Sequence, residues 1–405
     1  MPPPHSGYRW WILTSVFVTN VLVSGFGWSY VIMVPSAIVE DLGVTFEKWG
    51  LLWGGISFGA FLFSIPAGAL ADRFGVRHVV GASLGLAGAS LLLRAQVNGL
   101  VPMVACMVLF GLAVGSLFSN LPKALGIWFP REELGLANGV GLAGYGAGFT
   151  LVGFATVPLV EAFGGWRELT WVLGWGVLSF AVLWLLSVRD RAAPQNSEEI
   201  STLAGMGRVL RERDVWIPAL CYGLYNAGYL GATGYLVTFL MESKSLSEQA
   251  AGTFIATTSW TFVVGSLILP ALSDRVGRRR VVYLVGMALV AATVSLLATT
   301  RLPLIPLAVS WGFFTGGLSL LFTIPLEVES VGPRLGGSAA GLISTIGFAG
   351  GFDGPVIGLA LADLSPTLGL LFWAGCYLAS SALIVAARET GYASKPSPAP
   401  AASRA

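Results

Sequence analysis

Charge is scarce in this 405-residue chain, and the little that is present is nearly balanced. Asp, Glu, Lys and Arg make up 11% of the residues, whereas hydrophobic residues make up 55%. Soluble proteins carry roughly 25% charged residues, so a chain of this composition would not stay in solution as one globule, and we expect lipid to be its solvent. The net charge of +2 gives no sign of the basic surface that nucleic acids require.

Cysteine and histidine are also rare, with three and two copies. Cys106, Cys221 and Cys376 all lie inside apolar segments, where cysteine is typical as a small packed hydrophobe. Neither a disulfide framework nor a metal site is predicted. The chain has no phosphate-binding glycine loop, so we expect no cofactor, no direct use of ATP and no enzymatic activity.

Apolar segments of membrane length are abundant, and so is glycine, with 53 copies. A membrane-spanning helix needs about 20 predominantly apolar residues, and small residues let such helices pack closely. The first apolar segment is too long for a signal peptide and lacks a clear cleavage site, so we expect it to remain as a helix. The sequence predicts two groups of six spans, which are 10–36, 48–71, 78–96, 100–123, 135–160, 167–188, 215–241, 250–272, 281–300, 303–326, 336–362 and 367–387.

The polar stretches between and after these groups predict the domain organisation. The longest polar stretch reads as a cytoplasmic linker that includes a short amphipathic helix, and the last residues, rich in Pro, Ala and Ser, read as a disordered tail. The predicted first bundle, linker, second bundle and tail are residues 1–188, 189–214, 215–390 and 391–405.

The cations predict the orientation. If the N-terminus is cytoplasmic, 18 of the 23 Lys and Arg residues lie on the cytoplasmic side and five on the other. Cytoplasmic loops carry an excess of Lys and Arg, so we expect both termini to be cytoplasmic in a multi-pass protein of the cell's inner membrane. Arg94 belongs to the five and lies at the outer end of the third span, where we expect it to snorkel to the surface.

A charged loop occurs twice. The stretch from Gly68 to Arg77 contains Asp72-Arg73-Phe-Gly75-Val-Arg77, and Asp274-Arg275-Val-Gly277-Arg278-Arg279 follows 202 residues later. A repeat at half the chain length indicates two copies of one unit. Each copy ends one apolar segment, makes a tight glycine turn and starts the next segment with cations.

Both copies resemble the loop between helices 2 and 3 of the major facilitator superfamily (MFS), written G-x-x-x-D-R-x-G-R-R/K. The first copy departs from it at Val76, and the second has Pro270 in place of the first glycine. The resemblance covers nearly the whole chain. It implies an all-α membrane protein of twelve transmembrane helices in two pseudo-symmetric six-helix bundles, which moves a solute by rocking the bundles about a central site.

The resemblance also implies that the loops act as a latch. Asp72 would lie against the positive N-terminus of the eleventh helix, near Gly336, and Asp274 against that of the fifth, near Gly135, which would hold the cytoplasmic side shut. The alternative is that the loops only set topology and tight turns. The gating candidates are Asp72, Arg73, Arg77, Asp274, Arg275, Arg278 and Glu327.

Acidic partners for the loop arginines differ between the copies. Arg275 and Arg278 have plausible partners in Glu327 and Glu329 at the end of the tenth span. The fourth span instead ends in Lys123, so Arg73 has no obvious acid there unless Glu132 or Glu133 folds back.

One acid lies deep in a predicted span. Asp353 is within the eleventh span, and the position 202 residues earlier is Leu151, so this acid breaks the repeat. An ionisable residue inside a membrane is a functional candidate because burying it is costly. We expect a proton or cation coupling site or a substrate contact; the alternative is a cap at a helix break beside Gly354 and Pro355.

Neutral polar and aromatic residues supply the other site candidates. In the resembled family, spans 1, 4, 7 and 10 line the central cavity and spans 5, 8 and 11 complete it. Tyr222, Tyr225, Asn226 and Tyr229 follow a spacing of three to four residues and therefore share one helix face. For any single candidate the alternative is hydrogen bonding between helices. The candidates are Asn20, Trp28, Asn120, Tyr145, Tyr225, Asn226, Tyr229, Trp260 and Trp311.

Further resemblances bear on the substrate. The stretch 121–139 looks like the anion-carrying branches of the family, although the arginines of the nitrate/nitrite branch in spans 2 and 8 have no counterpart here. The glycine-rich stretch 139–148 resembles the antiporter motif of drug exporters but has Tyr145 in place of proline. We predict a monomeric secondary transporter of a small organic anion coupled to protons; the alternatives are efflux of hydrophobic compounds and a non-transporting receptor on the same fold.

Overall fold

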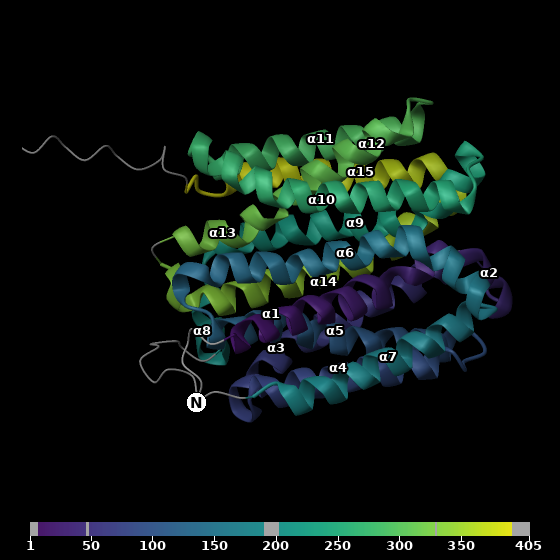
Figure 1. Ribbon diagram of the computed structural model, residues 1–405. Helices are drawn as coiled ribbons and strands as arrows, with labels where there is room; N and C mark the ends of the chain where they lie inside the picture. Colours follow the sequence, from purple (N-terminus) through teal and green to yellow (C-terminus); the bar gives the residue numbers. More distant parts are fainter. Residues whose placement is uncertain (1–6, 46–47, 190–201, 329, 391–405) are drawn as a thin grey trace, which may run out of the picture.

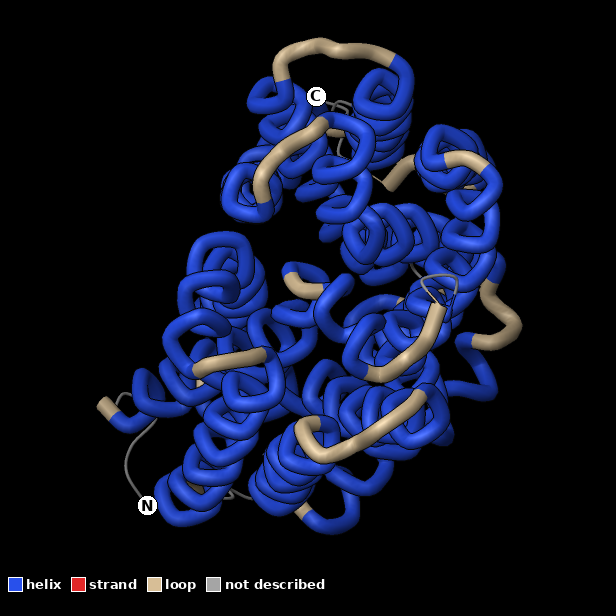
Figure 2. The backbone as a smooth tube through the Cα atoms, turned by 90° about the vertical axis from the view of Figure 1, so that its right-hand side faces the viewer, coloured by secondary structure: helices blue, strands red, loops and turns tan. Residues whose placement is uncertain are grey.

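The computed structural model describes residues 7–45, 48–189, 202–328 and 330–390. These residues form a bundle of long helices that run along one common direction (Figure 1). Figure 2 views the bundle nearly along the helix axes. The predicted all-helical membrane fold is confirmed, and no strand occurs in the described ranges. Residues 190–201 of the predicted linker 189–214 and the predicted tail 391–405 lie outside the described residues, whereas the rest of the linker includes a short helix, Thr202–Val209.

The first-half helices precede the linker. Five of them cross the bundle as single helices after an irregular first span. They are α1 Tyr8–Thr19, the π-helix η1 Asn20–Gly27, the 3₁₀-helix η2 Tyr30–Met33, α2 Pro35–Asp41, α3 Trp49–Phe74, α4 Val76–Arg94, α5 Leu100–Trp128, α6 Arg131–Phe163 and α7 Trp166–Ser187.

A short helix and the second-half helices follow. They are α8 Thr202–Val209, α9 Arg213–Lys244, α10 Glu248–Val276, α11 Arg279–Thr299, α12 Leu304–Thr315, the 3₁₀-helix η4 Gly316–Leu318, α13 Ser319–Glu327, α14 Gly332–Leu364, α15 Pro366–Leu383 and the 3₁₀-helix η5 Ile384–Ala386.

Eleven segments of the described chain are long and apolar enough to cross a membrane. Helix α9, which corresponds to the predicted seventh span, is not among them. From Asp214 to Leu240 nearly all of its residues are buried by other helices. A helix that meets protein on most sides needs less apolar surface than one that meets lipid, so its tyrosines, Asn226 and glycines are compatible with a place inside the bundle.

Two predicted spans are not regular α-helices. The first contains the π-helix η1, in which a Cβ on Gly25 would lie 2.6 Å from the Gly148 Cα. The tenth is interrupted by η4, where Gly316 lies against the backbone of Gly265 and Ser266. In both places glycine lets two backbones touch, and the local winding differs where they meet.

The two repeated loops have the predicted glycine turns. Gly75 has φ +85° and Gly277 has φ +69°, conformations that glycine adopts without the strain of a Cβ. Both turns lie at the same end of the bundle as α8, at the left in Figure 1. We call this the loop end, and the other the opposite end.

Candidate functional site: an aromatic centre and two charged loops

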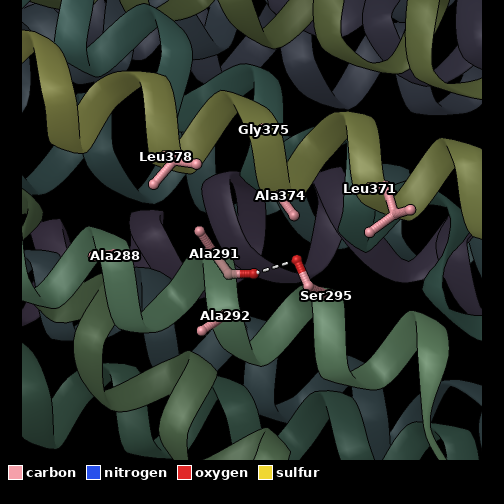
Figure 3. Close-up of a pocket in the computed structure, with 8 residues that line it drawn as sticks. All are labelled: Ala288, Ala291, Ala292, Ser295, Leu371, Ala374, Gly375 and Leu378. Carbon is pink, nitrogen blue, oxygen red and sulfur yellow. Dashed lines mark hydrogen bonds between the residues drawn. The ribbon is translucent and has the colours of Figure 1, made fainter.

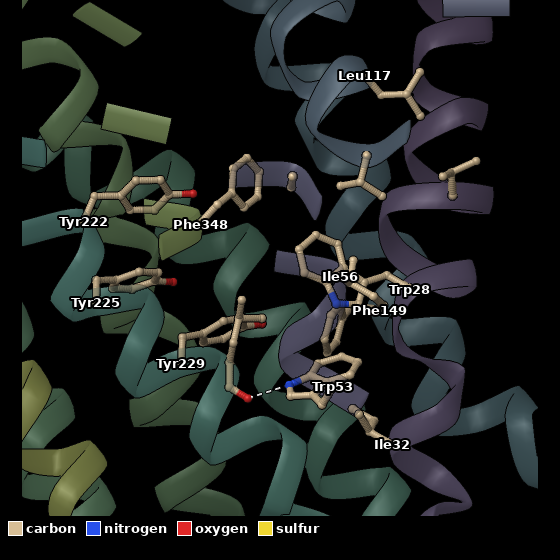
Figure 4. Packing of buried hydrophobic residues seen from close by; sticks show 14 of the residues in the cluster. Trp28, Ile32, Trp53, Ile56, Leu117, Phe149, Tyr222, Tyr225, Tyr229 and Phe348 are labelled. Atoms are coloured by element: carbon tan, nitrogen blue, oxygen red, sulfur yellow. Dashed lines mark hydrogen bonds between the residues drawn. The ribbon is translucent and has the colours of Figure 1, made fainter. Parts of the chain in front are cut away.

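Aromatic side chains from both halves meet in the middle of the bundle. The central aromatic cluster consists of Trp28, Trp53, Phe118, Tyr145, Phe149, Tyr222, Tyr225, Tyr229 and Phe348. Figure 4 shows the tyrosines of α9 and Phe348 on one side, facing Trp28, Trp53 and Phe149 on the other.

Ring contacts join the halves across this cluster. The centroids of Phe149 and Tyr229 are 6.3 Å apart, and those of Phe118 and Phe348 are 5.6 Å apart. The hydroxyls of Tyr145 on α6 and Tyr229 on α9 lie close enough to interact. A group bound here would therefore touch both halves at once.

The predicted tyrosine face on α9 is present. Tyr225 stacks on Tyr229 at 5.7 Å and on Tyr222 at 6.0 Å. Tyr225 also meets Tyr377 edge-on at 5.9 Å, and the indole N–H of Trp311 donates to the Tyr377 hydroxyl at 3.3 Å. Trp311 is therefore linked to Tyr225 of the cluster through the side chain of Tyr377.

Two of the predicted amides lie between helices. The Asn20 amide donates to the Gly141 carbonyl at 2.9 Å, and the Asn120 amide donates to the Ala67 carbonyl at 3.2 Å. These bonds fit the alternative interpretation, helix-to-helix bonding. Asn226 is buried beside the cluster, and its amide and the Tyr222 ring both lie against Gly347.

The side chain of Trp28 has an unused donor. Its indole is almost fully buried, 6.3 Å from Trp53 and 6.5 Å from Phe348 by ring centroids, and its N–H has no partner among the described residues. The buried hydroxyl of Ser24, four residues earlier, has none either. These groups offer hydrogen-bond donors to a ligand in the cluster.

The prediction for Trp260 is wrong. Its side chain is 61% exposed and shares a face of α10 with Leu267, which is 66% exposed. Ser259 and Val263 instead face Gly146 on α6. Trp260 therefore lies on the outer surface of the bundle, because in a lipid-facing helix both faces are apolar and spacing alone does not tell them apart.

Asp353 is not part of the cluster, although it follows Phe348 by five residues on α14. It is exposed on α14 together with Ile357, one turn further on. Helix α14 runs unbroken from Gly332 to Leu364, so Asp353 does not cap a helix break, and this alternative is wrong. The coupling role of this acid stays a prediction.

The first repeated loop is tied to neighbouring helices of its own half. Lys123 forms an ion pair with Asp72 at 2.6 Å and donates to the Gly68 carbonyl at 2.8 Å. Arg77 donates through Nε to the Leu185 carbonyl at 3.0 Å, which binds the loop to the end of α7. The Arg73 guanidinium lies 5.1 Å from the Phe74 ring centroid.

The second loop corrects a prediction. Arg279, and not Arg275 or Arg278, binds the acid at the end of the tenth span: its NH2 lies 2.7 Å from Glu327 Oε1 and its NH1 lies 2.6 Å from Asp274 Oδ1. Arg279 begins helix α11, so its side chain reaches α13, while Glu329 lies outside the described residues. Because Arg279 follows Arg77 by 202 residues, the repeat offset could have identified it.

The halves meet closely toward the opposite end. The indole N–H of Trp53 donates to the Leu230 carbonyl at 2.7 Å, and that of Trp49 to the Gly234 carbonyl at 2.9 Å. Gly153 on α6 lies against Gly252 on α10 so closely that a Cβ on either would collide with the other's carbonyl. The ion pairs of the two loops, by contrast, each join groups of one half, so the predicted latch between halves stays a prediction.

A groove on the outside of the second half is of a different kind. It lies between α11 and α15, has a volume of about 370 Å³ and is lined by Ala, Gly, Leu and Ser295 (Figure 3). The Ser295 hydroxyl donates to the Ala291 carbonyl at 2.8 Å, so this polar group is already used. The groove is far less suited to a polar solute than the central aromatic cluster.

Comparison with known proteins agrees with this architecture. The family model described as Major Facilitator Superfamily matches residues 16–355, and a second match covers residues 219–404. The chain is 25% identical to the probable sulfoacetate transporter SauU of Cupriavidus necator over 79% of this chain and 80% of that protein. It is also 25% identical to the nitrite extrusion protein of Bacillus subtilis, over 83% and 84%.

A solved structure shows the same fold. The bacterial homologue of the human lysosomal transporter Spinster, in an inward-facing and unoccupied conformation, superposes with a TM-score of 0.75 at 14% identity, covering 94% of this chain and 95% of that one.

Proposed function

The chain belongs to the Major Facilitator Superfamily, and from this premise we propose that it carries a small organic anion across the cell's inner membrane by alternating access, coupled to protons. Both termini are proposed to be cytoplasmic, so that the loop end faces the cytoplasm. The proposed division into residues 1–188 and 215–390 provides the two rocking bundles, with 189–214 as the linker.

The observation that carries the proposal is the central aromatic cluster. It is built from both halves and offers the hydroxyls of Tyr145, Tyr225 and Tyr229 together with the Trp28 N–H. Hydroxyl and indole N–H groups donate hydrogen bonds to carboxylate or sulfonate oxygens. The relatives whose names give a substrate support an anion, since sulfoacetate and nitrite are both anions.

The same arrangement suits alternating access. The indole bonds of Trp49 and Trp53 close the opposite end, which the proposed orientation places outside. The described conformation is therefore proposed to be closed to the outside. A solute that binds the cluster from the cytoplasmic or the outer side would exchange these contacts for others as the halves rock.

Efflux of a hydrophobic compound is the second candidate, because the cluster is mostly aromatic carbon. Uptake into proteoliposomes under an imposed pH gradient separates the two. We expect accumulation of small carboxylates or sulfonates and none of hydrophobic dyes; gradient-driven movement of dyes alone would contradict the proposal. A receptor on this fold would move neither.

A matched pair of variants tests the site. Tyr229→Phe removes one hydroxyl of the central aromatic cluster and keeps the ring that contacts Phe149 of the other half, and we expect a lower apparent affinity for the anion. Tyr283→Phe is the control, because its buried hydroxyl bonds Ser380 between α11 and α15, away from the cluster. Equal losses in both variants would argue against a substrate site at Tyr229.

A further inference from the structure

A buried arginine in the first half has no acceptor for any of its donors. Arg94, the last residue of α4, has a side chain that is 0% exposed, and Nε, NH1 and NH2 all lack a hydrogen-bond partner among the described residues. The expectation that Arg94 snorkels to the surface is therefore wrong. Its guanidinium lies 4.9 Å from the Phe110 ring centroid and 6.0 Å from that of Tyr30.

The position of Phe110 shows how deep this charge lies. Side chains on a helix lean toward its N-terminus, so Arg94 at the end of α4 leans back into the bundle. Phe110 is ten residues into α5, about 15 Å from the start of that helix at roughly 1.5 Å per residue. The guanidinium thus lies well inside the span, between α4, α5 and the first span.

An arginine cannot escape this position by losing its proton. Its side chain stays protonated in proteins, and an isolated charge away from water is costly unless a counter-charge is near. The cation–π contacts with the two aromatic rings offset only part of that free-energy cost. The arginine therefore requires an acceptor that also carries negative charge.

Asp41, an acid at this end of the first half, is already paired. Asp41 accepts from Arg167 Nε at 2.7 Å and from the Trp166 indole N–H at 3.1 Å. Arg167 also donates to the Ala95 and Val97 carbonyls at 2.9 Å each. These bonds hold the loop that follows Arg94 against α7.

The first span adds further unused polar groups rather than an anion. The Tyr30 hydroxyl is engaged with the Thr170 hydroxyl at 2.5 Å. The adjacent Ser29 hydroxyl is fully buried and has no partner among the described residues. Water would satisfy the N–H groups of Arg94 but would leave its charge uncompensated.

We propose that Arg94 binds a small monovalent anion within the first half, beside Tyr30 and Phe110. The ligand chemistry is that of a halide or of a single carboxylate or sulfonate head group. The proposal does not depend on the transported solute, because Arg94, Tyr30 and Phe110 all belong to the first half.

Anion-dependent stability is the first test. The melting temperature of the purified protein is measured in bromide, chloride and gluconate at one ionic strength. We expect a saturable rise of several degrees in the halides over the bulky gluconate, because a ligand that binds only the folded state stabilises it. Arg94→Met should abolish this dependence, while Arg301→Met, at an exposed arginine of the outer end, should keep it.

Anomalous diffraction from bromide-soaked crystals is the second test, and it remains decisive if Arg94→Met does not fold. A bromide peak within hydrogen-bond distance of the Arg94 nitrogens supports the proposal. No peak there, together with equal melting temperatures of the wild type in all three salts, shows hydration only and overturns it.

Competition identifies the source of the anion. If a transported carboxylate removes the bromide peak at Arg94, the site holds the head group of the solute; if the peak persists, the site holds a resident halide. Both outcomes support an anion at Arg94. A protein that binds bromide there but transports no organic anion would refute the proposed function and leave this inference intact.

Discussion

The contacts of Trp49 and Trp53 at the opposite end, which is the proposed outer end, lead to a measurable prediction. Each indole N–H donates to a carbonyl of α9 across the halves, at 2.9 and 2.7 Å. Changing both residues to Phe keeps an aromatic ring at each position and removes these two bonds, together with part of the buried indole packing. We expect the outward-open population to rise.

The size of the effect follows from the bonds that are lost. One buried hydrogen bond contributes about 0.5–1.5 kcal/mol net. The two carbonyls keep their hydrogen bonds within α9, so neither is left as a buried acceptor without a partner. The pair amounts to about 1–3 kcal/mol, which is a change of roughly 5- to 150-fold in the equilibrium between the two conformations at about 1.4 kcal/mol per factor of ten.

Thiol labelling measures this population. Ser57 is buried one turn deeper than Trp53 on α3, so Ser57→Cys should react with an impermeant maleimide from outside only when that end opens. The three native cysteines are buried. When opening and closing are fast compared with the thiol reaction, the labelling rate is proportional to the open population. Under these conditions we expect the double Trp→Phe variant to label about 5- to 150-fold faster than the protein with both tryptophans.

Trp373→Phe provides the control. The Trp373 indole is also buried and donates to the Gly354 carbonyl at 2.9 Å, but both residues belong to the second half. Labelling of Ser57→Cys should be unchanged by this substitution. If the control accelerates labelling as much as the double variant, or if neither does, these indole bonds do not hold the outer end closed.

Three further predictions concern the charged residues. Glu327→Gln weakens the contact with Arg279 and should lower the free energy of unfolding by about 1 kcal/mol in chemical denaturation, since the pair is partly exposed; an unchanged value would show that Asp274 suffices. Asp72→Asn weakens the partly exposed ion pair with Lys123, which is worth about 0–1 kcal/mol, and should slow transport if the loop is a latch; transport at the wild-type rate would favour the alternative of a simple turn. Asp353→Asn should abolish gradient-driven accumulation while leaving exchange of labelled solute intact, and full accumulation would remove the proposed coupling role.

Periodicity and repetition in the sequence predicted the features that depend on the spacing of residues along the chain. The offset between the two loops, their glycine turns and the shared face of Tyr222, Tyr225 and Tyr229 all follow from spacing along one or two helices. These features are present at Gly75 and Gly277 and in the stacked rings of α9.

The wrong predictions depend on where a side chain goes after it leaves its helix. Spacing in the loop does not say whether Arg278 or Arg279 reaches Glu327; the start of α11 at Arg279 does. The predictions for Trp260 and Arg94 were wrong for a related reason. An apolar helix in lipid has no polar face to mark its exposed side, and a long side chain near a helix end leans either to the surface or into the bundle, as packing permits.

The two ends of the molecule hold the halves by unequal means, and this bears on which end limits the rocking motion. At the loop end, the carboxylates of Asp72 and Asp274 are partly exposed, 39% and 52%, and each is paired within its own half. Exchanging such a solvated partner for a helix N-terminus of the other half alters little free energy, because surface ion pairs contribute about 0–1 kcal/mol.

The opposite end is held by buried backbone contacts. A Cβ on Gly50 of α3 would lie 2.8 Å from the Pro355 carbonyl oxygen on α14, and Gly153 and Gly252 touch in the same way between α6 and α10. Separating such helices gives up close packing along their whole contact, together with the indole bonds. In the proposed cycle, opening the outer end is therefore the step with the larger free-energy change.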